Sequence, residues 1–378
     1  MGASASIPAR AKAAVGKYFV KTESGTAVVS PKPAHPVLNL EEDSSNEAIV
    51  DDYRGERRVT ETKIIVETPK KDHLNERFLN QYRYTSKFPI GTGTSSRVFL
   101  CEDMDQMRMV AIKEVNKSLM LKMSHQFEKS YIKDGFRREI AVMKKLVHPN
   151  IGQLIEVLDD DKHKRLYLVL EYFGGGDFGD SFKSTSPYTD EVQLRTWAFG
   201  LCDAIRHCHK HNIVHRDIKT ENVLRTKDHK RCALIDFGMS HMWEEDPEHS
   251  AMREEDAASH FNASATNDKL IKAMGTPVYF APEILKSKFG SQTVNGKKRH
   301  KAKRYHGKPV DLWAFGVLLF KIVRGVCPYI DTNRLVYMRM IANANPSIDL
   351  DLTTGISPLL TDLMRKLLEP DPSKRITA

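Results

Sequence analysis

The run Ile90-Gly91-Thr92-Gly93-Thr94-Ser95-Ser96-Arg97-Val98 places two glycines between residues typical of strands. Because glycine has no Cβ, its backbone amides can come close to phosphate oxygens. The dinucleotide-binding fingerprint is excluded, since that motif needs a helix after the glycines and a strand is expected here. A GxG is also common in ordinary hairpin turns. The run is therefore either a phosphate-binding loop or a plain hairpin.

A fixed cation beside the glycines would favour the first interpretation. Lys113 ends the apolar run Val110-Ala111-Ile112, and Glu139 shares a helix face with Met143, well placed to orient that lysine. Taken singly, a lysine at a strand end and a glutamate on a helix are usually solvated surface residues. Their meaning depends on the motifs that follow.

The run His215-Arg216-Asp217-Ile218-Lys219-Thr220-Glu221-Asn222 is followed by Asp236-Phe237-Gly238. Ala281-Pro282-Glu283 and Asp311-Leu312-Trp313-Ala314-Phe315-Gly316 come after them. One such tripeptide arises by chance, but the whole series in this order, together with the loop, the lysine and the glutamate above, does not. From Tyr82 to Ala378 the chain resembles the protein kinase superfamily.

The resemblance implies a role for each polar residue in moving a phosphoryl group from ATP to a protein hydroxyl. Asp217 would accept or align the proton of the attacking hydroxyl, and Lys219 would neutralise the phosphate in transit. Asn222 and Asp236 would supply hard oxygen ligands to Mg²⁺. Lys113, oriented by the helix glutamate, would hold the α- and β-phosphates.

Further residues are expected to surround the adenine. Backbone groups of Glu171 and Phe173 would face the ring, with Leu170 as the gatekeeper. The apolar residues expected to sandwich the ring are Val98, Ala111 and Leu224. Ser96 stands in place of the third loop glycine and adds a hydroxyl near the phosphates.

The segment Gly275-Thr276-Pro277, together with the lysine of the catalytic run, is similar to the serine/threonine class. Thr276 is expected to hydrogen-bond Asp217 and that lysine. Residues 267–275 contain no Ser, Thr or Tyr, and the nearest acceptor upstream is Thr266. We therefore expect basal activity that needs no phosphate on this segment.

Three segments are similar to the calcium/calmodulin-dependent protein kinase kinases: residues 79–82, 139–160 and 307–329. This resemblance implies protein substrates that are themselves kinases, including the AMP-activated type. The chain stops at 371–378, where kinases usually continue into a last helix, so a truncated or minimal C-lobe is expected. Calmodulin is not an expected partner, because the basic run 297–304 lacks the apolar anchors of a calmodulin-binding helix.

Periodicity from about residue 80 onward predicts strands first and helices later. The expected strands are Tyr82–Ile90, Ser96–Cys101, Met109–Val115, Leu166–Glu171, Val223–Leu224 and Cys232–Ile235. One helix should end at His148-Pro149, and a long one should start at Thr189-Asp190-Glu191. The fold class is thus α+β, with an N-lobe at 79–171 and a C-lobe at 177–378. Thr220 stands where the family usually has proline, and we expect it to loosen that turn.

Residues 1–78 are expected to form a mostly disordered extension, because a basic start and an acidic stretch show no sustained apolar periodicity. The start Met1-Gly2-Ala3-Ser4-Ala5-Ser6 fits the N-myristoylation pattern, with Gly2 as the acceptor. One acyl chain binds a membrane only marginally, and the basic residues between 10 and 21 would add the second signal. A chance Gly-Ser start is the alternative.

The chain has 378 residues, of which 40% are apolar, and a net charge of +9. No apolar run approaches the roughly 18 residues that cross a bilayer, and a signal core is absent. The five cysteines form no CxxC pair, which fits a reducing cytosol. We expect a cytoplasmic protein that associates with membranes through its N-terminus.

Two other classes are alternatives. A pseudokinase or a scaffold at a membrane would share the fold without the chemistry. Against it, the four residues that catalysis needs are all present: Lys113, Asp217, Asn222 and Asp236. Nucleic-acid binding would use the seven Lys and Arg residues within 297–308. Tyr305 is the only Phe, Tyr or Trp among these basic residues that could stack on a base. A solvated loop is therefore the better interpretation, and no nucleic-acid partner is expected.

Overall fold

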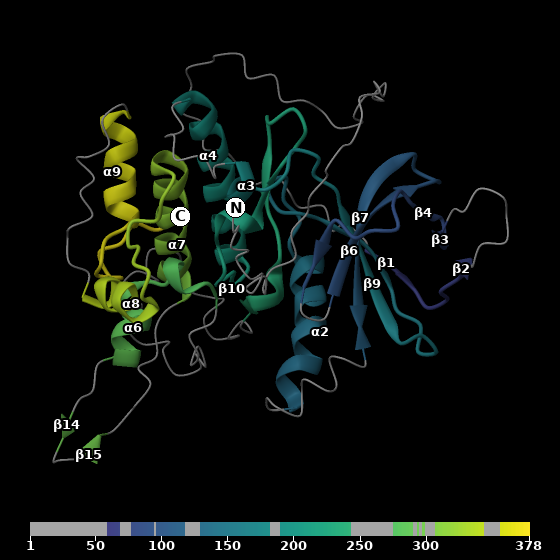
Figure 1. Ribbon diagram of the computed structural model, residues 1–378, viewed down its shortest axis with the longest axis horizontal. Coiled ribbons are helices and arrows are strands. Elements are labelled where there is room, and N and C mark those ends of the chain that lie inside the picture. Colours follow the sequence, from purple (N-terminus) through teal and green to yellow (C-terminus); the bar gives the residue numbers. More distant parts are fainter. Residues whose placement is uncertain are drawn as a thin grey trace, which may run out of the picture.

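The computed structural model describes residues 59–68, 77–93, 96–117, 129–181, 190–242, 275–289, 293–294, 297–298, 307–343 and 356–378. They form a strand-rich lobe and a helical lobe, drawn at the right and left of Figure 1. The expected bilobal α+β fold is confirmed. The candidate residues Gly2, Thr94, Ser95 and Thr266 lie outside the described residues.

The N-lobe is built on one curved, mostly antiparallel sheet. Its strands, in sheet order, are β1 (Thr60–Thr62), β8 (Leu154–Leu158), β9 (Arg165–Glu171), β7 (Arg108–Asn116), β6 (Ser96–Asp103), β4 (Tyr82–Tyr84), β3 (Phe78–Leu79) and β2 (Glu67–Thr68), with β5 (Gly91–Thr92) paired to β6. Alternate residues point to opposite faces. Val98, Ala111 and Leu168 thus join the main core, whereas Phe99, Ile112 and Val169 form a second core on the other face.

The prediction of one strand over Tyr82–Ile90 is wrong, because β4 ends at Tyr84 and β5 begins only at Gly91. Pro89 has no N–H to donate to a ladder. The Ser86 hydroxyl accepts the Phe88 amide at 3.0 Å and so replaces a cross-strand hydrogen bond with a local one. The chain therefore bends before the glycine loop.

Residues 59–68, which we call the N-terminal strap, contribute to both ends of this sheet. β1 pairs in parallel with β8, and β2 pairs with β3. Between them Ile65 is buried in the second core, and the Val66 amide donates to Asn80 Oδ1 at 2.7 Å. The strap also reaches helix α2 (Lys129–Lys145) through an ion pair of Glu61 with Lys144. Among the described residues, two strands thus lie ahead of the boundary expected at residue 79.

The C-lobe packs helices around a buried central helix. Its elements are α3 (Phe178–Ser181), α4 (Glu191–Lys210), β10 (Ile213–Val214), η1 (Thr220–Asn222), β11 (Val223–Arg225), β12 (Cys232–Leu234), η2 (Phe237–Met239), β13 (His241–Met242), η3 (Pro277–Tyr279), α6 (Pro282–Phe289), β14 (Thr293–Val294), β15 (Lys297–Lys298), α7 (Gly307–Arg324), α8 (Arg334–Asn343) and α9 (Pro358–Leu367). α4 starts where expected, with Asp190 accepting the Gln193 amide as its N-cap. Arg375 makes an ion pair with Glu283, at 2.8 Å.

Candidate active site

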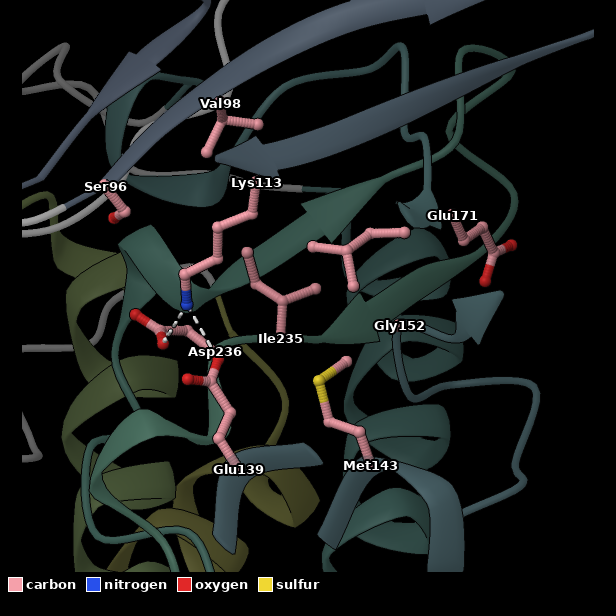
Figure 2. A pocket seen from close by; sticks show the side chains of 10 residues that line it. Ser96, Val98, Lys113, Glu139, Met143, Gly152, Glu171, Ile235 and Asp236 are labelled. Atoms are coloured by element: carbon pink, nitrogen blue, oxygen red, sulfur yellow. Dashed lines mark hydrogen bonds and ion pairs between the residues drawn. The ribbon is translucent and has the colours of Figure 1, made fainter. Parts of the chain in front are cut away.

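A cleft that opens to solvent lies between the lobes, and residues from both lobes line it. Figure 2 shows how they converge. The lining residues are Ser96, Val98, Lys113, Glu139, Met143, Gly152, Leu170, Glu171, Ile235 and Asp236. Seven of these were singled out for this site in the sequence: Ser96, Val98, Lys113, Glu139, Leu170, Glu171 and Asp236.

Lys113 lies at the centre of the polar end of this cleft. Its Nζ donates to Glu139 Oε1 at 2.7 Å, so the contact expected from the sequence is present. The same Nζ lies 3.8 Å from Asp236 Oδ1 (Figure 2). The Glu139 side chain is only 4% exposed, whereas that of Asp236 is 32% exposed. One cation thus bridges strand β7, helix α2 and the residue before η2.

Burial and charge act in opposite directions on these carboxylates. Burial raises the pKa of Glu139, and Lys113 only partly opposes that effect. For Asp236 burial also favours a higher pKa, but Lys113, His215 and the Gly238 amide outweigh it and hold the pKa below the usual range. Asp236 therefore presents a charged, partly open oxygen to the cleft.

The glycine loop is a hairpin edge over the cleft. Gly91 pairs with Val98, and the Gly93 amide donates to the Ser96 carbonyl at 2.8 Å. Arg97 was expected among the nucleotide-binding residues, but its side chain pairs with Glu114 on the opposite face of the sheet. Alternation along β6 explains this, because Val98 faces the cleft and its neighbour must face away. Only the backbone of Arg97 belongs to the loop.

Of the residues expected around the adenine, Val98, Leu170 and Glu171 line the cleft. Ala111, Phe173 and Leu224 are buried, and Ile90 packs against the main core. Thr92 is exposed on β5. The Glu171 side chain points to Arg231, so its contribution to the cleft comes from the backbone and the side-chain stem.

Asp217 is held by Lys219 and Thr276, the two residues that the sequence analysis expected around it. Lys219 Nζ lies 2.5 Å from Asp217 Oδ2, and Thr276 donates to Oδ1 through both its amide and its hydroxyl, each at 3.1 Å. Lys219 Nζ also donates to the Thr276 hydroxyl at 3.1 Å, as expected. The Lys219 side chain is 2% exposed. Such a network fixes the carboxylate while leaving it as an acceptor.

Asn222 suits a hard metal ion. Its Nδ2 donates to the Asp217 carbonyl at 2.8 Å and to Oδ2 at 3.2 Å, which orients the amide. Its Oδ1 is buried and has no hydrogen-bond partner among the described residues. A buried acceptor without a partner is costly, and Mg²⁺ prefers oxygen ligands of this kind together with a carboxylate and phosphates. Asn222 and Asp236 therefore suit the role of Mg²⁺ ligands that the resemblance implies.

Several residues that shape the site were not singled out from the sequence. Asp311, buried at the start of α7, accepts the His215 amide at 2.9 Å and the Arg216 amide at 2.8 Å and so fixes the catalytic loop. Gly152 and Ile235 are in close contact at the back of the cleft. Asp311 stood inside a recognised motif, but nothing in the local pattern pointed to the other two.

The family model of the protein kinase domain matches residues 84–378, so the chain belongs to the protein kinase family. It is 31% identical over 297 residues to CBL-interacting protein kinase 26 of Oryza sativa subsp. japonica, covering 78% of this chain and 50% of that protein. The serine/threonine-protein kinase ssp1 of Schizosaccharomyces pombe is 30% identical over 303 residues (80% and 41%). Serine/threonine-protein kinase GRIK2 of Arabidopsis thaliana is 30% identical over 308 residues (81% and 65%).

The chain spans about half the length of the curated relatives it matches. Members of the family use ATP with Mg²⁺. Among the residues that the structure covers, no helix combines the length and apolar character needed to cross a bilayer.

Proposed function

We propose that the chain is a serine/threonine protein kinase that transfers the γ-phosphate of ATP to protein hydroxyls. The observation that carries the proposal is the Asp217 carboxylate, oriented by Lys219, Thr276 and Asn222 next to a cleft that holds Lys113 and Asp236. The pseudokinase alternative would not require this set of contacts to be complete.

ATP with Mg²⁺ supplies the phosphoryl group and neutralises its charge. Asp217 accepts the proton of the acceptor hydroxyl as the new O–P bond forms and the bond to the leaving ADP breaks. Lys219, buried between Asp217 and Thr276, stabilises negative charge at that point. Lys113 binds phosphate oxygens, and Glu139 positions its ammonium. Asn222 Oδ1 and Asp236 would hold Mg²⁺.

The test is phosphate transfer from ATP to peptides that differ only in a Ser, Thr or Tyr acceptor. We expect transfer to Ser and Thr that requires Mg²⁺ and is lost in Asp217→Ala. ATP binding without any transfer, in a preparation free of contaminating kinase, would favour the pseudokinase or scaffold.

An upstream role is the finer part of the proposal. Its support is the resemblance of residues 79–82, 139–160 and 307–329 to the calcium/calmodulin-dependent protein kinase kinases. We expect peptides copied from kinase activation loops, including the AMP-activated type, to be better substrates than composition-matched scrambled peptides. Equal rates for both sets would contradict the upstream role and leave the kinase activity intact.

A membrane association through an acylated Gly2 is proposed from the sequence pattern of residues 1–6 alone. We expect Gly2→Ala to move the protein out of a membrane fraction, with Ala3→Gly as the control. An unchanged distribution would refute acylation as the anchor.

A further inference from the structure

A polar cluster that the proposed mechanism does not use joins the C-terminal end of the catalytic loop, residues 215–222, to two helical elements. It consists of Thr220, Glu221, Tyr279 and Lys321. Lys321 Nζ donates to the Thr220 hydroxyl at 2.9 Å and lies 3.8 Å from Glu221 Oε1. Thr220 Oγ1 in turn donates to Glu221 Oε2 at 3.0 Å, and the Tyr279 hydroxyl lies 3.1 Å from Oγ1. The cluster ties the catalytic loop to α7 and η3.

Two unusual features of the sequence meet here. Thr220 replaces the proline expected at this position, and Lys321 is the first charge after the apolar run Leu312–Phe320 of α7. A proline would have neither the hydroxyl nor the amide, which lies 3.4 Å from the Tyr279 hydroxyl. The prediction that Thr220 loosens the turn is therefore wrong, because its side chain anchors the turn on Lys321.

The charged ends of the cluster are accessible and close to Asp217. The side chains of Glu221 and Lys321 are 28% and 22% exposed, whereas Thr220 and Tyr279 are buried. Glu221 is four residues after Asp217. A peptide whose hydroxyl reaches Asp217 extends by roughly 3.5 Å per residue. Glu221 therefore lies no more than roughly 14 Å along the chain from Asp217, and we expect a substrate side chain within about four positions of the acceptor to reach Glu221 and Lys321.

Without Lys321, the Glu221 carboxylate would select a basic residue in the substrate, since it would form a charge-assisted hydrogen bond with Arg or Lys. Lys321 already supplies that cation from within the chain. A basic substrate side chain would have to displace Lys321 and would be repelled by it. The pair thus removes the reason to prefer a basic neighbour.

We propose that Lys321 is a specificity-determining residue that fills the acidic subsite at Glu221. The chain then phosphorylates Ser or Thr in protein segments whose side chain at this subsite is uncharged. The inference rests on the proposed kinase function and narrows its substrate class.

The test compares kcat/KM for peptides with one Thr acceptor and Arg, Ala or Glu at each position within four residues of it. For the full chain we expect an Arg-to-Ala ratio near one or below at every position. In Lys321→Met, which keeps the aliphatic stem but removes the charge, the ratio should rise about tenfold at one position, chiefly through KM. Adding Glu221→Gln should abolish that rise.

A reciprocal variant guards against a folding defect. Glu221→Gln alone leaves Lys321 without its carboxylate and should raise the Glu-to-Ala ratio severalfold at the same position. Lys366→Met, which removes a lysine paired with Asp362 on α9, is the matched control and should change no ratio.

The proposal is overturned if the ratios of Lys321→Met and Glu221→Gln equal those of the unmodified chain, whatever happens to overall activity. A merely structural Lys321 would lower the rate for all peptides alike. A complete lack of transfer by the unmodified chain would instead contradict the proposed kinase function, and this inference with it.

Discussion

Lys113 and Lys219 both pair with a carboxylate, but they do so in different ways. Lys219 and Asp217 are two residues apart in one loop, and Thr276 bonds to both. Lys113 reaches from β7 to Glu139 on α2, a separation of 26 residues. The local pair persists wherever the loop is folded, whereas the distant pair depends on the position of a whole helix. The distant pair is thus the one that changes elsewhere in the N-lobe can break.

The largest effect is expected at the local pair. Asp217→Ala should lower kcat by about 10³-fold or more, because the proton of the acceptor hydroxyl loses its acceptor, while ATP binding is retained. Asp217→Asn keeps an oxygen for Thr276 and should be equally inactive. Asp236→Ala should in addition lose Mg²⁺-dependent ATP binding, measured by calorimetry. More than a few per cent of activity in Asp217→Ala would contradict the role.

A smaller effect is expected at the distant pair. Lys113→Met should lower kcat/KM for ATP by about 10²-fold, because it removes the cation that contacts phosphate. Glu139→Gln keeps an oxygen acceptor for Lys113 and should cost about tenfold or less. Steady-state kinetics at varied ATP measure both. Equal losses would mean that Glu139 does more than position Lys113.

A third change tests how tightly the cleft is packed next to the distant pair. A Cβ on Gly152 would lie 2.7 Å from Ile235 Cγ2 (Figure 2), which is too close. Gly152→Ala should therefore raise the KM for ATP by about tenfold or less. The double variant Gly152→Ala/Ile235→Ala should recover most of the loss, since the smaller side chain makes room. A KM for ATP in the double variant as high as in Gly152→Ala would show that contact with Ile235 is not the cause of the loss.

The smallest effect concerns stability. Burial, together with Arg216 and Arg138, lowers the pKa of His241 from 6.5 to about 4. Between these values the unfolded chain binds a proton that the folded chain does not, so this contribution to stability falls as pH drops from about 6.5 to 4. Between pH 7 and pH 5 the free energy of unfolding of the unmodified chain should therefore fall by roughly 1 to 2 kcal/mol more than that of His241→Asn. Denaturant unfolding at the two pH values measures both. Parallel losses in both proteins would show that the pKa of His241 is not lowered.

The sequence predicted best what is close in the chain or belongs to an ordered motif. The spacing of Asp217, Lys219 and Asn222 lies within one loop, and their contacts follow from it. The Lys113–Glu139 contact was also predictable, because β7 and α2 are both strongly patterned. Gly152 and Ile235 are far apart in the chain, and no periodicity brings them together. Thr220 could not be interpreted correctly, since its partners Tyr279 and Lys321 lie more than fifty residues away.

The N-terminal strap has a consequence for where a folded fragment can begin. The family match starts at residue 84, but Ile65, Leu79 and Tyr82 belong to the second core. A fragment cut at residue 84 would leave the edge of β8 unpaired, and an open strand edge is a template for aggregation. It would also deprive Glu156, which is 5% exposed, of the Tyr82 hydroxyl at 2.6 Å. A fragment intended for crystallisation or assay should therefore start before Val59.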